Sequence, residues 1–346
     1  MFSILSIWRN IIMEKFITLA HGAGGKHTSE LIESVFKAHF YNPLFTGDDA
    51  AILPIPGEKL AFSTDGFIVS PPDFAGGNIG KLSICGTVND LACMGAKPMY
   101  LSCAMVIEEG LPVEDLKRYV TSMEDTAKEV GVLIVAGDTK VAGKGQVDKL
   151  FITTTGIGKV TPGLSLSGTK AKPGDVIMVT GDIGRHGCTI LLARNKFGID
   201  AEITSDCAPL WSLVDNMLKA TRDIHVIRDA TRGGVGTVLY EIAAQSQVGI
   251  CLKSTAIPVH PSVRGVCGLL GLEPLYLACE GRMVIIVPEE QAMKVLDTLR
   301  HSPHGEETAI IGRVTDELVG HVVMETEIGT KTMLPPPRGE LLPRIC

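Results

Sequence analysis

Residues 88–98 read Val-Asn-Asp-Leu-Ala-Cys-Met-Gly-Ala-Lys-Pro and join the end of a helix to the start of a strand. The helix is indicated by apolar residues that recur every three or four positions over residues 78–94. A strand is predicted to follow at Met99–Val106. Asp90 interrupts the otherwise apolar helix, and a carboxylate there costs stability unless it is paired, caps a helix or binds a metal. The stretch therefore predicts a buried helix beside a strand and a charged group near the helix end.

Helices and strands continue to alternate on both sides of this stretch. Further strands are predicted at residues 59–64, 132–136, 150–156, 176–180, 283–287 and 309–314. Further helices are predicted at residues 112–131, 208–220, 235–245 and 289–300. Two blocks that each mix helices and strands predict the α/β (α+β) fold class and two sheet-containing domains.

A stretch rich in turn residues, 161–175, separates the two blocks and sets the expected domain limits. We expect an N-terminal domain over 17–165 and a C-terminal domain over 172–334. Residues 1–16 are expected to be either a disordered extension or an extension that results from an upstream start. Residues 335–346 are expected to form a mobile tail.

Composition excludes several classes of protein. The chain has 346 residues, of which 45% are hydrophobic, so it can bury a large core. Its net charge of -7 argues against binding nucleic acid, which requires a basic surface. Nine cysteines without a Cys-x-x-Cys pair favour reduced thiols in the cytoplasm over disulfides or structural zinc. The apolar start, Met1–Ile12, is too short to span a membrane, and no later stretch is typical of a membrane span.

Aspartates at four places in the first half are candidates for binding a cation. They are Asp48-Asp49, Asp65, Asp90 and Asp138, and we expect them in loops or at the ends of elements. Any one of them alone would be an ordinary turn or cap residue. Four together, among glycines, favour a Mg²⁺ ion that bridges carboxylates and nucleotide phosphates. Lys140 could neutralise phosphate oxygens or could be a solvated surface lysine.

Two motifs in the second half could take part in the same chemistry. Arg232-Gly233-Gly234 leads into an apolar helix, and the backbone amides at a helix start can bind an anion. The same glycines could instead allow close packing. Glu280, at the entrance of a predicted strand, is a candidate general base or an ion-paired surface residue.

The chain ends in Pro343-Arg344-Ile345-Cys346, after a tail that begins at Pro335. Proline favours an extended path, and twelve residues could span at most about 40 Å. The thiol of Cys346 could therefore be loaded at one place and processed at another. A frayed terminus with an accidental cysteine is the other interpretation.

These residues together resemble the HypE family of hydrogenase maturation proteins. The wider superfamily includes aminoimidazole ribonucleotide synthetase, selenophosphate synthetase and thiamine-monophosphate kinase. The motifs that carry the resemblance run from about Ile17 to Cys346, and the final Pro-Arg-Ile-Cys separates HypE from the rest. The others are Gly47-Asp48-Asp49-Ala50-Ala51, Ser63-Thr64-Asp65-Gly66, the stretch 89–98, Gly137-Asp138-Thr139-Lys140 and Asp229-Ala230-Thr231-Arg232-Gly233-Gly234.

The resemblance implies a two-domain fold like that of aminoimidazole ribonucleotide synthetase, with the N-terminal domain binding ATP and forming a homodimer through its strands. It implies Mg²⁺ held by Asp48, Asp65, Asp90 and Asp138. The residues expected to bind the nucleotide and its metal are Asp48, Asp49, Asp65, Asn89, Asp90, Gly137, Asp138, Thr139, Lys140, Arg232, Gly233 and Gly234.

The reaction implied by the resemblance is a dehydration of the chain's own modified C-terminus. A HypF-like carbamoyltransferase would deliver a carbamoyl group to Cys346, and ATP would phosphorylate its oxygen. Loss of phosphate would leave a thiocyanate, whose cyano group would pass to iron on a HypC–HypD complex. We expect Cys346, Lys140 and Glu280 to act in catalysis. The alternatives are a small-molecule kinase or synthetase of the same superfamily and a docking platform without catalysis.

Overall fold

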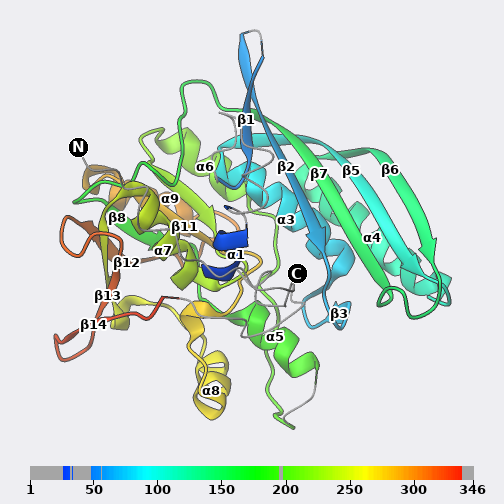
Figure 1. Ribbon diagram of the computed structural model, residues 1–346. Coiled ribbons are helices and arrows are strands. Elements are labelled where there is room, and N and C mark those ends of the chain that lie inside the picture. The colour runs from blue at the N-terminus through cyan, green and yellow to red at the C-terminus, as the bar shows by residue number, and fades with distance from the viewer. Residues whose placement is uncertain (1–25, 32, 34–47, 56, 195–197, 337–346) are drawn as a thin grey trace.

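A computed structural model describes residues 26–31, 33, 48–55, 57–194 and 198–336 of the chain. These residues form two halves, each built on its own β-sheet (Figure 1). The predicted α/β (α+β) class is confirmed. The predicted boundary at 165–172 lies between the last strand of the first sheet and the first strand of the second, and the domain limits stay predictions.

The sheet of the N-terminal half has five strands in the order β1-β2-β7-β5-β6. All neighbours are antiparallel except β5 and β6. The strands are β1 (Ala51–Ile55), β2 (Glu58–Phe67), β5 (Ala96–Glu108), β6 (Leu133–Ala142) and β7 (Leu150–Val160). A small two-stranded ribbon, β3 (Asp73–Phe74) and β4 (Gly77–Asn78), leads into the first long helix.

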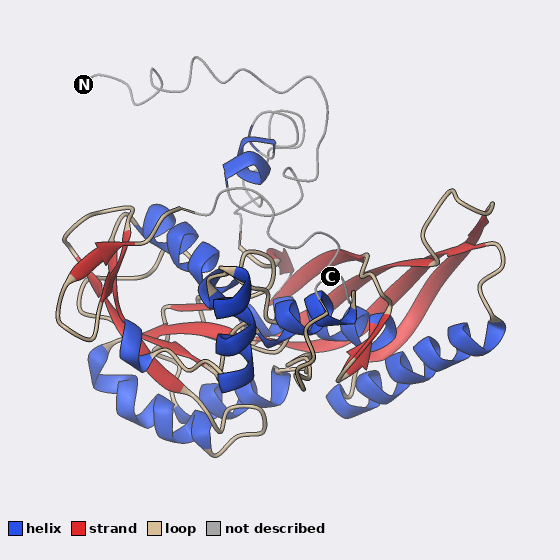
Figure 2. Ribbon diagram, turned by 90° about the horizontal axis from the view of Figure 1, so that it is seen from below, coloured by secondary structure: helices blue, strands red, loops and turns tan. Residues whose placement is uncertain are grey.

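Two helices, α3 (Ile79–Cys93) and α4 (Val113–Val130), lie along one side of this sheet (Figure 2). Asn78 begins α3 because its side chain accepts a hydrogen bond from the amide of Lys81. Gly131 ends α4 with a positive φ of 78°, which glycine adopts without strain. The alternation of buried and exposed residues along β2 and β7 follows from this one-sided cover.

Helix α3 is buried all round rather than on one face. It contacts β2 and β7 on one side. On the other side it contacts β9 (Val226–Asp229) and α6 (Trp211–Ala220) of the C-terminal half. The largest hydrophobic cluster accordingly combines α3 residues such as Leu82 with C-terminal residues such as Met178 and Leu210. The two halves therefore share one core.

The sheet of the C-terminal half has seven strands in the order β14-β13-β10-β12-β8-β11-β9, with only β10 and β13 parallel. The strands are β8 (Val176–Val179), β9 (Val226–Asp229), β10 (Gly249–Lys253), β11 (Met283–Val287), β12 (Ala309–Thr315), β13 (Val322–Glu325) and β14 (Lys331–Met333). Strand β11 is buried along its whole length, as its unbroken apolar run predicts.

Five longer helices and two 3₁₀ turns complete the C-terminal half. They are α5 (Arg185–Ala193), α6 (Trp211–Ala220), α7 (Gly234–Ser246), η4 (Ser254–Ala256), α8 (Pro261–Leu270), η5 (Pro274–Tyr276) and α9 (Glu289–Arg300). A short helix, α1 (Lys26–Leu31), precedes the first sheet. Within the described residues, no helix combines the length and apolarity needed to cross a bilayer.

Two predicted positions of aspartates were wrong. Asp65 and Asp138 do not lie in loops or at the ends of elements, because β2 continues to Phe67 and β6 continues to Ala142. Both strands extend further because their neighbours β7 and β5 are long enough to keep pairing with them.

Candidate functional site

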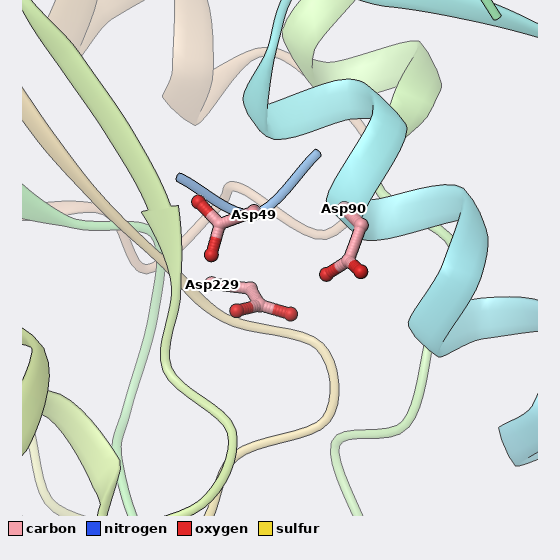
Figure 3. A group of neighbouring side chains, drawn as sticks. All are labelled: Asp49, Asp90 and Asp229. Atoms are coloured by element: carbon pink, nitrogen blue, oxygen red, sulfur yellow. The ribbon is translucent and has the colours of Figure 1, made fainter. Parts of the chain in front are cut away.

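Three carboxylates from distant parts of the sequence converge where the two halves meet (Figure 3). Asp49 lies just before β1, Asp90 lies near the end of α3, and Asp229 is the last residue of β9. One carboxylate oxygen from each lies within 4.8 Å of those of the other two. The site therefore forms only when the halves pack together.

A fourth carboxyl group, that of Asp65 on β2, lies close enough to Asp90 for its charge to raise the pKa of Asp90. The hydroxyl of Ser63, two residues earlier on the same face of β2, donates to Asp90 Oδ2 at 2.5 Å. We call Asp49, Asp65, Asp90 and Asp229 the acidic cluster.

Positive charge near the acidic cluster comes from two arginines. Arg228 Nε donates to Asp49 Oδ1 at 2.8 Å, and its Nη2 donates to Glu241 Oε2 at 3.0 Å. Arg232 lies close enough to Asp65 for its charge to lower the pKa of that carboxyl. Because Arg228 also pairs with Glu241, the four carboxylates outnumber the cationic side chains that the described residues place beside them.

The pKa values of the four carboxyl groups reflect their burial first and the charges around them second. Burial raises the pKa of Asp49 to about 6, although the Arg228 guanidinium acts in the opposite direction. Burial and then the neighbouring carboxylates raise the pKa of Asp90 and Asp229 well above the ordinary range. Burial also raises the pKa of Asp65. Such a cluster is stabilised either by bound protons or by a cation.

The donor set fits a hard divalent cation. All four side chains offer only oxygen, which is what Mg²⁺ prefers. Asp49 Oδ2, although within ion-pair distance of Arg228, accepts no hydrogen bond from the described residues. A buried carboxylate oxygen that accepts no hydrogen bond is suited to ligate a metal.

The glycine motif lies next to the acidic cluster because it follows Asp229 directly. Gly233 and Gly234 have φ values of 76° and 62°, and α7 begins at Gly234. A Cβ on Gly234 would lie 2.5 Å from the carbonyl oxygens of Leu275 and Leu277. Close packing therefore accounts for the glycines, and the same arrangement leaves the start of a 13-residue helix beside Arg232.

Glu280 lies in the loop before β11 and is almost fully buried. Its Oε1 has no hydrogen-bond partner among the described residues. Burial, followed by the charges of Cys207 and Asp229, raises the pKa of Glu280 well above its usual value. The carboxylate of Asp206 positions this loop by accepting hydrogen bonds from the amides of Glu280 and Gly281.

Asn89 connects the two halves. Its Nδ2 donates to the carbonyl of Ala208 at 3.1 Å and to that of Glu280 at 3.5 Å, and its Oδ1 accepts from the amide of Leu210 at 2.8 Å. The side chain predicted to bind nucleotide thus holds the segment before α6 against α3.

Other predicted residues lie away from the acidic cluster. The carboxylate of Asp48 accepts hydrogen bonds from the Ser167 hydroxyl at 3.1 Å and the Gly168 amide at 3.0 Å. It thereby fixes the segment between the two sheets. Its neighbour Asp49 is the one that enters the cluster.

Gly137, Asp138, Thr139 and Lys140 lie on β6, at the edge of the N-terminal sheet. Asp65 on β2 and Gly137 on β6 belong to one row of paired residues, with Thr154 and Cys103 between them. Three strand spacings separate the two ends of this row by about 14 Å. The Lys140 ammonium lies 2.9 Å from the Asp138 carboxylate, and both side chains are exposed. A single chain does not bring these residues to the acidic cluster.

Cys346 lies outside the described residues. Asp229 was missed as a candidate ligand, although it belongs to a quoted motif. The available signal was an aspartate at the end of the buried strand Val226–Asp229, a place where functional side chains commonly lie.

The fold and the site define a protein of the AIR synthase related class. The protein-family model for the N-terminal domain of AIR synthase related proteins matches residues 47–160. The family model for their C-terminal domain matches residues 172–325.

Individual relatives narrow this class. The carbamoyl dehydratase HypE of Rhodobacter capsulatus is 45% identical over 97% of this chain and 99% of its own. A crystal structure of HypE in complex with ATP superposes with a TM-score of 0.81, at 47% identity, over 96% of this chain and 100% of that one. The HypE–HypF complex gives a TM-score of 0.85 at 45% identity, over 89% of this chain and 99% of that one. The chain belongs to the HypE carbamoyl dehydratase family.

Proposed function

We propose that this chain is an ATP-dependent dehydratase that converts a thiocarbamate on its own Cys346 to a thiocyanate. The observation that carries the proposal is the acidic cluster, which is short of positive charge and lies beside a helix start. The similarity to a HypE structure that contains ATP supports ATP as a ligand of this chain.

The chemistry explains the need for ATP. The oxygen of a carbamoyl thioester is a poor leaving group, and transfer of the γ-phosphoryl group to it makes a good one, with ADP released. Loss of phosphate and of both amide protons then leaves a carbon–nitrogen triple bond on sulfur. A bound Mg²⁺ would neutralise charge on the phosphates. Asp49, Asp65, Asp90 and Asp229 would hold it, with Arg232 and the start of α7 facing the phosphate oxygens.

Glu280 is proposed as the base that removes the amide protons. Its raised pKa makes the deprotonated carboxylate a strong proton acceptor, although the carboxyl holds its proton until the pH approaches that pKa. We therefore expect the dehydration rate to rise with pH. In Glu280→Gln, dehydration should fall by about 100-fold or more while phosphorylation by ATP persists; an unchanged dehydration rate would exclude this role.

A homodimer is proposed because the described residues leave one side of the N-terminal sheet uncovered. Phe62 and Tyr100 are 39% and 42% exposed on that side. Along the edge strand β6, Leu133, Val135 and Val141 are each more than 60% exposed. Apolar surface of this extent on a sheet is typical of an interface, here with a second copy.

The proposed dimer gives Asp138 and Lys140 a role in the partner's site. They lie on the proposed dimer surface, and Gly137, which precedes Asp138, is about 14 Å from Asp65 of their own acidic cluster, so we propose that they serve the site of the partner copy. Asp90→Asn and Lys140→Ala chains should each be inactive alone, and mixed dimers should regain about a quarter to a half of the activity. Failure of mixing to restore activity, in dimers verified by mass, would contradict this assignment.

The proposed partners are a HypF-like carbamoyltransferase, which loads Cys346, and a HypC–HypD complex, which accepts the cyano group. The first is supported by the solved HypE–HypF complex. A cytoplasmic location is proposed, since the eight described cysteines are all free thiols.

Mass spectrometry of the C-terminal peptide tests the function. After incubation with HypF, carbamoyl phosphate and ATP, the peptide should gain a carbamoyl group and then lose one water. Cys346→Ala should bind ATP normally and show neither change. Labelling that persists in this variant would remove the tail from the mechanism.

The two alternatives are distinguished by other outcomes. A small-molecule kinase or synthetase would turn over a free substrate when the chain is truncated before Pro335. A docking platform would bind HypF without releasing phosphate from ATP.

A further inference from the structure

The last described residues leave the C-terminal half at a place held by two tyrosine hydroxyls. The hydroxyl of Tyr240, on α7, donates to the carbonyl oxygen of Leu334. The hydroxyl of Tyr276, the last residue of η5, donates to the carbonyl oxygen of Pro335. Two consecutive carbonyls at the base of the tail are therefore bound by side chains from two different elements.

Leu334 is fixed by more than its carbonyl. Its side chain is 5% exposed and belongs to a hydrophobic cluster against which Tyr240 and Tyr276 also pack. Its amide donates to the carbonyl of Val322 at 2.9 Å. The chain is thus anchored at Leu334, whereas Pro335 and Pro336 are exposed.

Tyr276 also contacts the helix that begins at the glycine motif of the proposed nucleotide site. A Cβ on Gly236 would lie 2.6 Å from Tyr276 Cε1, so the ring packs directly on the first turn of α7. Burial raises the pKa of Tyr276 to about 12, which keeps the hydroxyl neutral and able to donate at any physiological pH. The base of the tail and the start of α7 are therefore joined through one side chain.

We propose that Tyr240 and Tyr276 are positioning residues that hold Leu334–Pro335 as a fixed starting point for the tail, next to the glycine motif. This inference rests on the proposed function, in which Cys346 must reach the acidic cluster. Packing alone does not explain the hydroxyls, since phenylalanine would fill the same space.

The fixed starting point shortens the tether that carries Cys346. With the anchor in place, residues 336–346 form the tether between the anchor and Cys346. Among the described residues, strand β14 pairs only with β13, and its three residues are exposed, so it depends on the anchor that follows it. If the anchor and β14 both detach, the tether comprises residues 327–346. The effective concentration of the thiol at the site then falls about two- to threefold, since it scales with roughly the −3/2 power of tether length.

Hydrogen exchange of the peptide that covers residues 331–336 tests the anchor without any need for activity. Tyr240→Phe and Tyr276→Phe each remove one hydroxyl, and exchange should become about fivefold faster for a lost neutral hydrogen bond. Tyr240→Phe should have the larger effect, because the Leu334 carbonyl is buried and the Pro335 carbonyl can bind water. Tyr119→Phe is the matched control, because its hydroxyl donates to Asp73 Oδ2 at 2.7 Å in the N-terminal half.

The second measurement is single-turnover dehydration of loaded full-length protein. The double variant Tyr240→Phe/Tyr276→Phe should dehydrate two- to threefold more slowly at unchanged ATP affinity, and Tyr119→Phe should match the parent. Unchanged exchange in the double variant would overturn the anchor, and faster exchange with unchanged dehydration would overturn the positioning role. If the parent chain itself failed to dehydrate, the proposed function would fall, and the exchange result would still decide the anchor.

Discussion

The guanidinium of Arg228, on β9 of the C-terminal half, lies 2.8 Å from the carboxylate of Asp49, which precedes β1 of the N-terminal half. The two side chains are only 11% and 7% exposed. The ion pair therefore crosses the junction between the halves at the edge of the acidic cluster. The charge of Arg228 balances that of Asp49.

Arg228→Met should strongly destabilise the metal-free protein. It leaves Asp49 and Glu241 without their shared cation, and breaking a buried pair from one side costs about 3 kcal/mol or more. Urea denaturation measures the loss. Arg313→Met is the control, since its pair with Glu289 is exposed and screened by water and should contribute little to stability. Equal losses in the two variants would contradict the buried role of Arg228.

Asn89→Ala should affect both stability and catalysis. The change leaves the buried amide of Leu210 and the carbonyl of Ala208 without partners, which costs about 2 kcal/mol of unfolding free energy. ATP turnover should fall as well, because the halves that form the site are joined there. Asn216→Ala provides the comparison, since its bond to Ser302 lies within one half; it should lower stability only. Normal turnover in Asn89→Ala would argue against coupling between this junction and the site.

Asp90→Asn should abolish most activity without unfolding the protein. The amide keeps the shape of the carboxylate and can still accept from Ser63, while repulsion within the acidic cluster falls. Turnover of Mg-ATP should decrease by about 100-fold or more, since even indirect partners of a metal commonly contribute 10- to 100-fold. Asp316→Asn, in an exposed turn, should behave like the parent. Unchanged turnover in Asp90→Asn would exclude a metal-binding role for Asp90.

Stability should depend on pH in a way that a divalent cation reverses. The pKa of Asp49 is about 6 in the folded protein against an ordinary 3.8, so the folded state binds the proton more tightly. The stability that this tighter proton binding adds to the folded state is fully present below about pH 4 and is lost as the pH rises through 6. In the absence of metal, the parent should therefore lose stability relative to Asp49→Asn as the pH rises from 4 to 7. Saturating Mg²⁺ should shrink this loss, because deprotonated Asp49 is then a ligand. A pH-independent difference would show that Asp49 titrates normally.

Local patterns were enough to predict most elements. Pro112 and Gly131 mark the limits of α4, and the apolar run Met283–Val287 coincides with β11. Helix α8 was missed because its ten residues include two glycines, and β13 and β14 were missed because they are too short to show alternation. These short strands form by pairing with neighbours from elsewhere in the chain, which local sequence does not reveal.

The site was predictable only in part, because its members meet through tertiary structure. Asp65 and Asp90 were identified from their motifs, and in the structure the charge of Asp65 raises the pKa of Asp90. Asp229 needed knowledge that β9 lies against α3, and Asp138 lies at the far edge of the sheet because β7 and β5 separate β6 from β2. Spacing along the chain contains neither fact.

Helix α3 has no solvent-facing side, and this affects how the protein unfolds. Thirteen of its fifteen residues are buried, some under the first sheet and some under the C-terminal half. Separating the halves would expose one of these apolar surfaces to water, so neither half can melt much before the other. Calorimetry should show a single cooperative transition, and residues 47–160 expressed alone should aggregate rather than fold.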